Sequence, residues 1–309
     1  MRYLTFSAPG NDQPRLGALL SDNLVVDLTL KDDYPNSMLE LLQIGSKEIK
    51  LLNEQLDQTN PEEPSSLGWQ REAVKILPPV PEPPSLRDFY AFEQHVATAY
   101  ANRGREVPKA WYEMPVFYFS NPQSAYGHED EIPMPSYTQA LDYELEVGAV
   151  IGQPGRDIPA EKAMEHIFGF TNFNDWSARD EQRREMSVGL GPAKGKDFAS
   201  SFGPYLVTPD ELDDRSTGRP GVYDLEMVAR VNGEERSRGN WKDLYYSFGE
   251  MIARASADVW LQSGDIIGSG TVGTGCLLEL TKGNGPWLKK GDIVELEIER
   301  LGLLRNTVI

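Results

Sequence analysis

Hydrophobic and polar residues alternate in short runs along most of the chain, a pattern typical of strands. Near the N-terminus, the runs 3–6 and 23–28 have this alternation, with turn residues between them. Apolar residues then recur at helical spacing across 36–55, and Gly45 interrupts the middle of that segment. The proline-rich stretch 77–84 predicts a stiff, extended connector. We therefore expect a small N-terminal domain at 1–77 and a larger main domain at 78–309.

The larger domain also consists mainly of predicted strands and turns. Residues 226–231 and the residues from Glu234 onward flank Asn232-Gly233, a dipeptide that favours a type I′ hairpin turn. Strands are also predicted in the segments 264–268 and 291–298. Helices are predicted at 160–168, ended by Gly169, and at about 241–255. The predicted fold class is β-rich α+β, with helices packed outside a sandwich or barrel-like sheet.

Charge and composition restrict the class of partner. The 309 residues include 48 acidic and 30 basic side chains, which gives a formal net charge of −18 at pH 7. Nucleic-acid phosphates require a basic face, so the charge argues against a nucleic-acid partner. An anionic substrate would need local positive charge, from a metal or from clustered arginine and lysine.

The chain has one cysteine, Cys276, which rules out a disulfide framework and is expected to be a small buried side chain. No signal peptide is evident at the N-terminus, and no segment approaches the roughly 18 apolar residues of a membrane span. We expect no membrane partner and a cytoplasmic location.

Glu144 and Glu146 are the first candidates for chemistry, because strand alternation places them on one face. Two neighbouring carboxylates repel each other, and a bound cation removes that repulsion. Hard oxygen ligands suit Mg²⁺, Mn²⁺ or Ca²⁺. The alternative is an ordinary solvated strand face, but the apolar residues at 148–152 favour an inner strand. Asp175 lies in a polar run further along and is another candidate ligand.

His95 follows the proline-rich connector. If this segment is helical, Asp88 and His95 lie two turns apart on one face, so that Asp88 could bind a metal and His95 act as a base. The alternative is a surface helix with an incidental histidine. Arg179 and Gln182 follow Asp175 at helical spacing, and either donors for a substrate or a simple ion pair would explain them.

Four motifs in sequence order resemble those of the fumarylacetoacetate hydrolase family, across about residues 80–305. They are Asp88-Phe89-Tyr90 with His95, Asp142-Tyr143-Glu144-Leu145-Glu146, Asn174-Asp175-Trp176-Ser177-Ala178-Arg179-Asp180, and Gly268-Ser269-Gly270-Thr271 followed by Leu278-Glu279-Leu280. The third motif is highly specific. The resemblance implies a mixed β-sandwich roll, a divalent metal that is usually Mg²⁺ and sometimes Mn²⁺ or Ca²⁺, and a homodimer.

The resemblance also implies roles for individual residues. The metal ligands would be Asp88, Glu144, Glu146 and Asp175. His95 would be the general base, oriented by Glu279. The substrate would be held, or its oxyanion stabilised, by Arg179, Gln182 and Lys196. Three further positions match substrate-binding residues: Tyr90, Tyr118 and Thr271.

The implied activity is hydrolysis of a carbon–carbon bond in a 1,3-dicarbonyl acid, such as fumarylacetoacetate or an acylpyruvate. The substrate would be a small dicarboxylate or 2,4-dioxo acid. Other family members act on 2-oxo acids as decarboxylases, isomerases or hydratases, and a scaffold without catalysis is a third possibility. The retained His95 and Glu279 favour hydrolysis, because they can activate water. The chain departs from the family pattern in its length, since it is much shorter than animal fumarylacetoacetases. In addition, Met186 replaces a tyrosine of that pattern, and one residue is inserted before Lys196. These departures bear on how the distal end of the substrate is bound.

Overall fold

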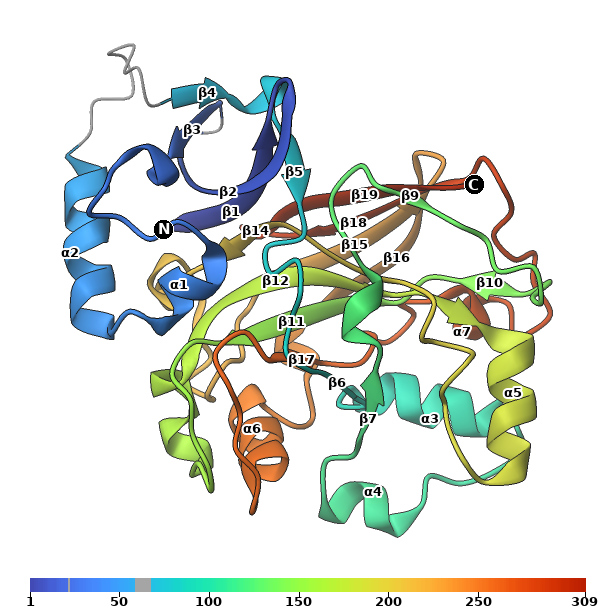
Figure 1. Ribbon diagram of the computed structural model, residues 1–309. Coiled ribbons are helices and arrows are strands. Elements are labelled where there is room, and N and C mark those ends of the chain that lie inside the picture. The colour runs from blue at the N-terminus through green and yellow to red at the C-terminus, as the bar shows by residue number, and fades with distance from the viewer. Residues whose placement is uncertain (22, 59–67) are drawn as a thin grey trace.

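The computed structural model describes residues 1–21, 23–58 and 68–309 (Figure 1). Residues 22 and 59–67, which fall in the predicted N-terminal domain, lie outside the described residues. Among the described residues the strands form sheets of twelve, five and two strands. The predicted β-rich mixture of strands and helices is confirmed.

The twelve-stranded sheet runs from the N-terminal residues to the candidate site. In spatial order its main path is β4 (Gly68–Gln70), β3 (Leu24–Asp27), β2 (Asn11–Ser21), β1 (Arg2–Ala8), β14 (Ser200–Val207), β12 (Ile167–Asp175), β11 (Leu145–Ile151), β17 (Ile266–Gly268), β6 (Leu86–Phe89) and β7 (Phe117–Ser120). Two short strands lie off this path, β5 (Lys75–Leu77) beside β1 and β8 (Ala125–Tyr126) beside β14. Because β1 pairs with β14, one sheet joins both predicted domains, and the division after residue 77 stays a prediction.

The five-stranded sheet contains the predicted hairpin. Its spatial order is β16 (Glu234–Asn240), β15 (Glu226–Val231), β18 (Ile293–Ile298), β19 (Gly302–Val308) and β9 (Glu131–Ile132). Asn232 and Gly233 join β15 to β16 with φ angles of 54° and 77°, as a type I′ turn requires. The strands predicted after Gly264 and Gly291 are β17 and β18. The remaining pair is β10 (Leu141–Asp142) with β13 (Ser177–Ala178).

The two larger sheets face each other, since β12 and β14 contact β18 and β19. Strand β11 is buried along its whole length and shows how the core is divided. Its residues Leu145, Val147, Ala149 and Ile151 enter a core cluster with side chains of β15 and β18. Val150 points to the opposite face, into a second cluster with Phe173 and N-terminal residues. This alternation makes β11 the inner strand that its apolar sequence predicts.

Helices lie outside the sheets (Figure 1). The α-helices are α1 (Met38–Gln43), α2 (Ser46–Asp57), α3 (Glu93–Ala101), α4 (Lys109–Glu113), α5 (Arg179–Val188), α6 (Phe248–Ser256) and α7 (Leu277–Leu280). Short 3₁₀ turns span Leu28–Leu30, Arg71–Ala73, Pro122–Ser124, Ala160–Glu165, Pro209–Arg215 and Trp241–Asp243. Gly45 separates α1 from α2, where the sequence makes the predicted helix uncertain. No helix within the described ranges is long and apolar enough to cross a membrane.

Two predicted helices are wrong in extent. The first ends at Glu165, and Gly169 lies inside strand β12, where a Cβ would come within 2.6 Å of the Val207 carbonyl oxygen on β14. Gly169 therefore permits close strand pairing and does not end a helix. The second consists of a short turn and the separate helix α6, which begins at Phe248 because Ser247 and Glu250 form a capping box.

His128 connects the turn after β8 to strand β19. Its side chain is buried, and its Nδ1 accepts a hydrogen bond from the Arg305 backbone N–H at 3.3 Å. Burial, followed by the nearby charge of Arg71, lowers the pKa of His128 to about 4. A proton on Nδ1 would also turn this acceptor into a second donor facing the same N–H. The folded protein therefore holds His128 in its neutral form.

This burial predicts a pH-dependent loss of stability. Between pH 6.5 and about 4, His128 takes up a proton in the unfolded chain but not in the folded one, so the free energy of unfolding falls as the pH decreases. His128→Gln should lack this component, which amounts to about 2 kcal/mol between pH 7 and pH 4.5. Urea unfolding of both proteins at the two pH values measures it, with His166→Gln as a control. An equal loss in the wild type and in His128→Gln would contradict the account.

Candidate active site

Four buried carboxylates converge at the ends of neighbouring strands. Asp88 lies in β6, Glu144 directly precedes β11, Glu146 lies in β11, and Asp175 ends β12. One oxygen of each lies within 4.8 Å of the others, and none of the four residues is more than 5% exposed. The structure thus brings together all four predicted metal ligands, with Glu144 and Glu146 on the same face as predicted.

Glycines leave room for these carboxylates. Strand β17 lies between β6 and β11 and ends at Gly268, where a Cβ would lie 2.4 Å from Asp88 Oδ1. The N–H of Gly270 donates to Asp88 Oδ1 at 3.1 Å and to Glu146 Oε2 at 3.0 Å. Gly270 has a φ of 76°, and a Cβ there would lie 2.5 Å from the Phe89 carbonyl oxygen. The loop Gly268-Ser269-Gly270-Thr271 therefore lies against the carboxylates themselves.

Two buried cations contact the cluster. Lys196 Nζ donates to Glu144 Oε2 at 2.5 Å and also to Asp175. Arg179 donates from Nη2 to Glu144 Oε1 and from Nε to Asp142 Oδ2, each at 2.8 Å. Five buried carboxylates, the four above and Asp142, thus share two buried cations, which leaves three negative charges unmatched when all are ionised.

The surplus charge separates the pKa values of these groups. Burial raises the pKa of Asp88 well above its usual range, and the nearby charge of Asp175 raises it further. Burial likewise raises the pKa of Glu146 well above its usual range, and the nearby charge of Asp88 adds to this increase. Burial also raises the pKa of Asp175 to about 6, although Lys196 opposes this shift. For Glu144, Lys196 and Arg179 together outweigh burial and lower the pKa. The ionised cluster is therefore strained by repulsion at its Asp88 and Glu146 side.

Two oxygens in the cluster have no hydrogen-bond partner in the part of the chain that the structure describes. They are Glu146 Oε1 and Asp175 Oδ1, both buried. Buried polar atoms are nearly always paired, so each orphan oxygen calls for a partner. A divalent cation held by Asp88, Glu144, Glu146 and Asp175 would satisfy both and offset the surplus negative charge. These hard oxygen donors fit Mg²⁺, Mn²⁺ or Ca²⁺, as the sequence predicts.

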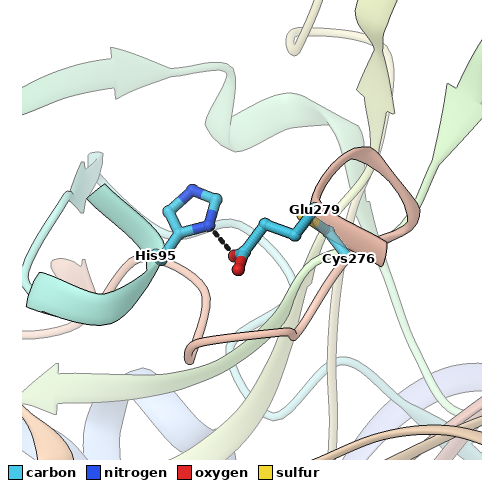
Figure 2. A group of neighbouring side chains, drawn as sticks. All are labelled: His95, Cys276 and Glu279. Atoms are coloured by element: carbon cyan, nitrogen blue, oxygen red, sulfur yellow. Dashed lines mark hydrogen bonds and ion pairs between the residues drawn. The ribbon is translucent and has the colours of Figure 1, made fainter. Parts of the chain in front are cut away.

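His95 on α3 and Glu279 on α7 form a buried pair (Figure 2). His95 Nδ1 is hydrogen-bonded to Glu279 Oε1, and Glu279 Oε2 accepts the Thr274 N–H at 2.9 Å. Figure 2 shows the second ring nitrogen on the side away from Glu279. When Nδ1–H of His95 donates its hydrogen bond to Glu279, Nε2 of His95 carries the free lone pair of the ring. Nε2 can then take a proton from a substrate.

Cys276 lies beside Glu279, at the start of α7. The thiol is free and buried, as predicted. Burial, with Asp142 nearby, raises the pKa of Cys276 well above its usual value. Cys276 is thus a neutral thiol packed behind the His95–Glu279 pair.

The relation of Asp88 to His95 differs from the prediction. Asp88 lies on strand β6 and the helix begins only at Glu93, so the two residues do not share a helix face. They still line the same cavity. The predicted shared helix of Asp175, Arg179 and Gln182 is also wrong for Asp175, which ends β12, whereas Arg179 donates to Gln182 at 3.1 Å within α5.

Asp142 is a buried residue beside the site to which the sequence analysis gives no role. Its carboxylate accepts the backbone N–H groups of Leu277 at 2.8 Å and Leu278 at 3.0 Å, at the start of α7. The same carboxylate holds Arg179. Asp142 therefore positions both Glu279 and Arg179. The signal was available, because a carboxylate beside buried Leu141 needs a partner.

A cavity of about 240 Å³ is lined by Asp88 and Glu144 of the carboxylate cluster and by His95 of the His95–Glu279 pair. All the predicted substrate-contacting residues line it, namely Tyr90, Tyr118, Arg179, Gln182, Lys196 and Thr271. Tyr118 donates its hydroxyl to Asp175 at 2.5 Å, and the Thr271 hydroxyl lies 3.4 Å from its neighbour's carbonyl oxygen. Arg103 and Met186 also line the cavity. The sequence prediction includes no role for Arg103, which lies in the turn after α3.

Comparisons with known proteins agree on one family. The family model described as "Fumarylacetoacetate (FAA) hydrolase C-terminal" matches residues 85–309. The mitochondrial oxaloacetate tautomerase FAHD2A of Bos taurus is 33% identical, covering 100% of this chain and 92% of the relative.

Two solved structures extend the likeness to the fold. A fumarylacetoacetate hydrolase from Exiguobacterium antarcticum superposes with a TM-score of 0.74 at 27% identity, covering 100% of this chain and 99% of that one. A 5-carboxymethyl-2-hydroxymuconate delta-isomerase from Mycobacterium smegmatis superposes with a TM-score of 0.69 at 25% identity, with the same coverage. Proteins named for different reactions thus share this architecture.

Replacement of one carboxylate in the cluster should affect stability and metal binding differently. Glu146→Gln replaces a carboxyl group whose ionisation is opposed by burial and by Asp88, so the unfolding free energy of the metal-free protein should not fall. The same change removes a ligand oxygen and should weaken Mg²⁺ and Mn²⁺ binding at least about tenfold, a loss seen even for outer-shell partners. Calorimetric titration and urea unfolding measure the two quantities, with exposed Glu131→Gln as the control. Unchanged metal affinity in Glu146→Gln would contradict the assignment.

Proposed function

Because the chain belongs to the fumarylacetoacetate hydrolase family, we propose that it catalyses proton transfer on a small 2-oxo dicarboxylate, in the manner of an oxaloacetate tautomerase. The observation that carries this proposal is the buried His95–Glu279 pair, whose His95 lines the cavity together with Asp88 and Glu144. The name of the Bos taurus relative supports the choice of substrate. The homodimer implied by the resemblance stays a prediction.

Tautomerisation needs one base and a correctly placed acid. His95 Nε2 takes a proton from the carbon next to the 2-oxo group, so that a C–H bond breaks and the electron pair moves toward the carbonyl oxygen. The protonated His95 then acts as the acid and gives a proton to that oxygen, which forms the O–H bond of the enol and returns His95 to its neutral form; the reverse steps regenerate the ketone. Glu279 holds the Nδ1 proton throughout and offsets the positive charge that His95 gains.

The remaining residues of the cavity bind and orient the substrate. Arg179 and Lys196 are buried cations that face the cavity, where they would stabilise the negative charge that develops on the carbonyl oxygen. Gln182 is oriented by its hydrogen bond with Arg179 and adds a further donor. A divalent cation held by Asp88, Glu144, Glu146 and Asp175 would supply Lewis-acid polarisation of the 2-oxo group.

Replacement of the base tests the proposal. His95→Gln should lower kcat for the enol-to-keto conversion of oxaloacetate by about 10² to 10⁴, the usual contribution of a general base. Mg²⁺ affinity should stay within about twofold, because His95 is outside the four-carboxylate set. Ultraviolet absorbance of the enol follows the reaction, with buffer containing Mg²⁺ alone as the blank and His166→Gln as the matched histidine control. Unchanged turnover in His95→Gln would overturn the role of His95.

A second candidate is hydrolysis of the carbon–carbon bond in fumarylacetoacetate or an acylpyruvate. The same His95–Glu279 pair favours it, because a base fixed at Nδ1 can equally remove a proton from water. Hydroxide would then attack the distal carbonyl, and Arg179, Gln182 and Lys196 would stabilise the oxyanion before the carbon–carbon bond breaks. The Exiguobacterium antarcticum fumarylacetoacetate hydrolase structure supports this alternative.

Product analysis separates the two candidates. The Mg²⁺-loaded enzyme is incubated with oxaloacetate, fumarylacetoacetate and acetylpyruvate, and then again with EDTA. Faster enol-to-keto conversion without carbon–carbon cleavage supports the tautomerase. Release of a carboxylic acid from the dioxo acids supports the hydrolase, and release of CO₂ would support a decarboxylase instead. No change in any of these substrates, by protein shown to hold metal, would overturn both candidates.

A further inference from the structure

A second cavity of about 760 Å³ opens beside the active-site cavity. The two cavities share residues in their walls, among them Arg103, Arg179, Gln182, Met186 and Leu278, so the second cavity adjoins the first. We call it the basic vestibule, because four exposed cations line it: Arg103, Arg105, Arg183 and Lys282.

These cations come from three separate segments of the chain. Arg103 and Arg105 lie in the turn after α3, Arg183 lies on α5, and Lys282 follows α7. The α5 and α7 segments approach closely, since Arg183 Nη2 lies 4.0 Å from a Cβ placed on Gly283. The fold therefore gathers positive charge that the sequence disperses over about 180 residues.

Carboxylates do not neutralise the vestibule. Glu279, the one acidic residue in its wall, is buried and bonded to His95. Arg179 is matched by Asp142 and Glu144. Within the described residues, the side chains of the four vestibule cations form no ion pair or hydrogen bond. Arg184, the neighbour of Arg183 on α5, by contrast pairs with Glu181 at 3.0 Å.

The positive charge of the basic vestibule contrasts with the negative charge of the protein as a whole. With a net charge of −18, the surface as a whole repels anions. Four cations without an ion pair among the described residues add local positive charge beside the active-site cavity, and their attraction for an anion extends over roughly a Debye length, about 8 to 10 Å at physiological ionic strength. An anion that reaches the active site through this cavity therefore passes from repulsion into attraction.

We propose that the basic vestibule binds the carboxylate at the far end of a dicarboxylic 2-oxo acid, opposite the 2-oxo acid group, and so selects dianionic 2-oxo acids over monoanionic ones. Arg183 and Lys282 are specificity-determining residues in this account, and Arg103 joins the vestibule to the active-site cavity. The inference rests on the proposed function for its reaction, but the binding preference is a separate property of the chain.

A matched pair of ligands tests the preference without turnover. 2-Oxoglutarate and 2-oxovalerate share the same 2-oxo acid end and differ in the distal carboxylate. Their affinities are measured by calorimetry on the Mg²⁺-loaded protein at low salt and at 0.5 M salt, a concentration chosen to screen exposed charges. The variants are Arg183→Gln/Lys282→Gln and the control Arg184→Gln/Lys290→Gln, which removes the same charge outside the vestibule.

The wild type should bind 2-oxoglutarate more tightly than 2-oxovalerate at low salt. Arg183→Gln/Lys282→Gln should lose about fivefold in affinity for 2-oxoglutarate, the effect of about two exposed ion pairs, and stay within about twofold for 2-oxovalerate. The difference should shrink at 0.5 M salt, and the control should match the wild type.

Equal losses for both acids, no loss for either, or no binding of either acid would overturn the proposal. The outcome is independent of the tautomerase assay. A selective loss of 2-oxoglutarate binding in a protein that does not convert oxaloacetate would uphold the vestibule and reject the proposed function. Tautomerase activity in the wild type, without a selective loss of 2-oxoglutarate binding in Arg183→Gln/Lys282→Gln, would uphold the proposed function and reject the vestibule.

Discussion

The structure depends on a surplus of buried negative charge at one place. Four carboxylates meet at the ends of β6, β11 and β12, and Asp142 on β10 is bonded to the same Arg179 as Glu144. Within the described residues, Lys196 and Arg179 are the cations that pair with these five carboxylates. Burial of that many ionised groups is costly unless further positive charge arrives. The oxygens of Glu146 and Asp175 that have no hydrogen-bond partner among the described residues mark the position where this positive charge is missing. Cation binding would thus complete a cluster that the fold has already assembled.

The fold assembles this charge and the base independently. The carboxylates lie on a rigid inner sheet, with Gly268 and Gly270 leaving space between the strands, whereas His95 and Glu279 lie on the short helices α3 and α7. Asp142 connects the two parts, because one carboxylate binds Arg179 and the start of α7. The metal ligands and the base can therefore be perturbed separately, which is what the expected behaviour of Glu146→Gln and His95→Gln exploits.

Much of this site could be predicted from local rules, and its limits have physical causes. Strand alternation placed Glu144 and Glu146 on one face, and Asn232-Gly233 specified its hairpin, because both rules act within a few residues. Family resemblance supplied the pairing of His95 with Glu279, which lie 184 residues apart in sequence and which no local pattern connects. Gly169 was misread as a helix end, since its role is contact with a neighbouring strand. The basic vestibule escaped prediction because three distant segments create it.

The most direct test of the central claim is a crystal structure of the protein saturated with Mn²⁺, with anomalous scattering used to locate the ion. The account expects one strong anomalous peak among the oxygens of Asp88, Glu144, Glu146 and Asp175, with Glu146 Oε1 and Asp175 Oδ1 turned toward it. A structure without anomalous density at this position, in which Lys196 still bridges Glu144 and Asp175 and both oxygens remain unpartnered, would contradict it.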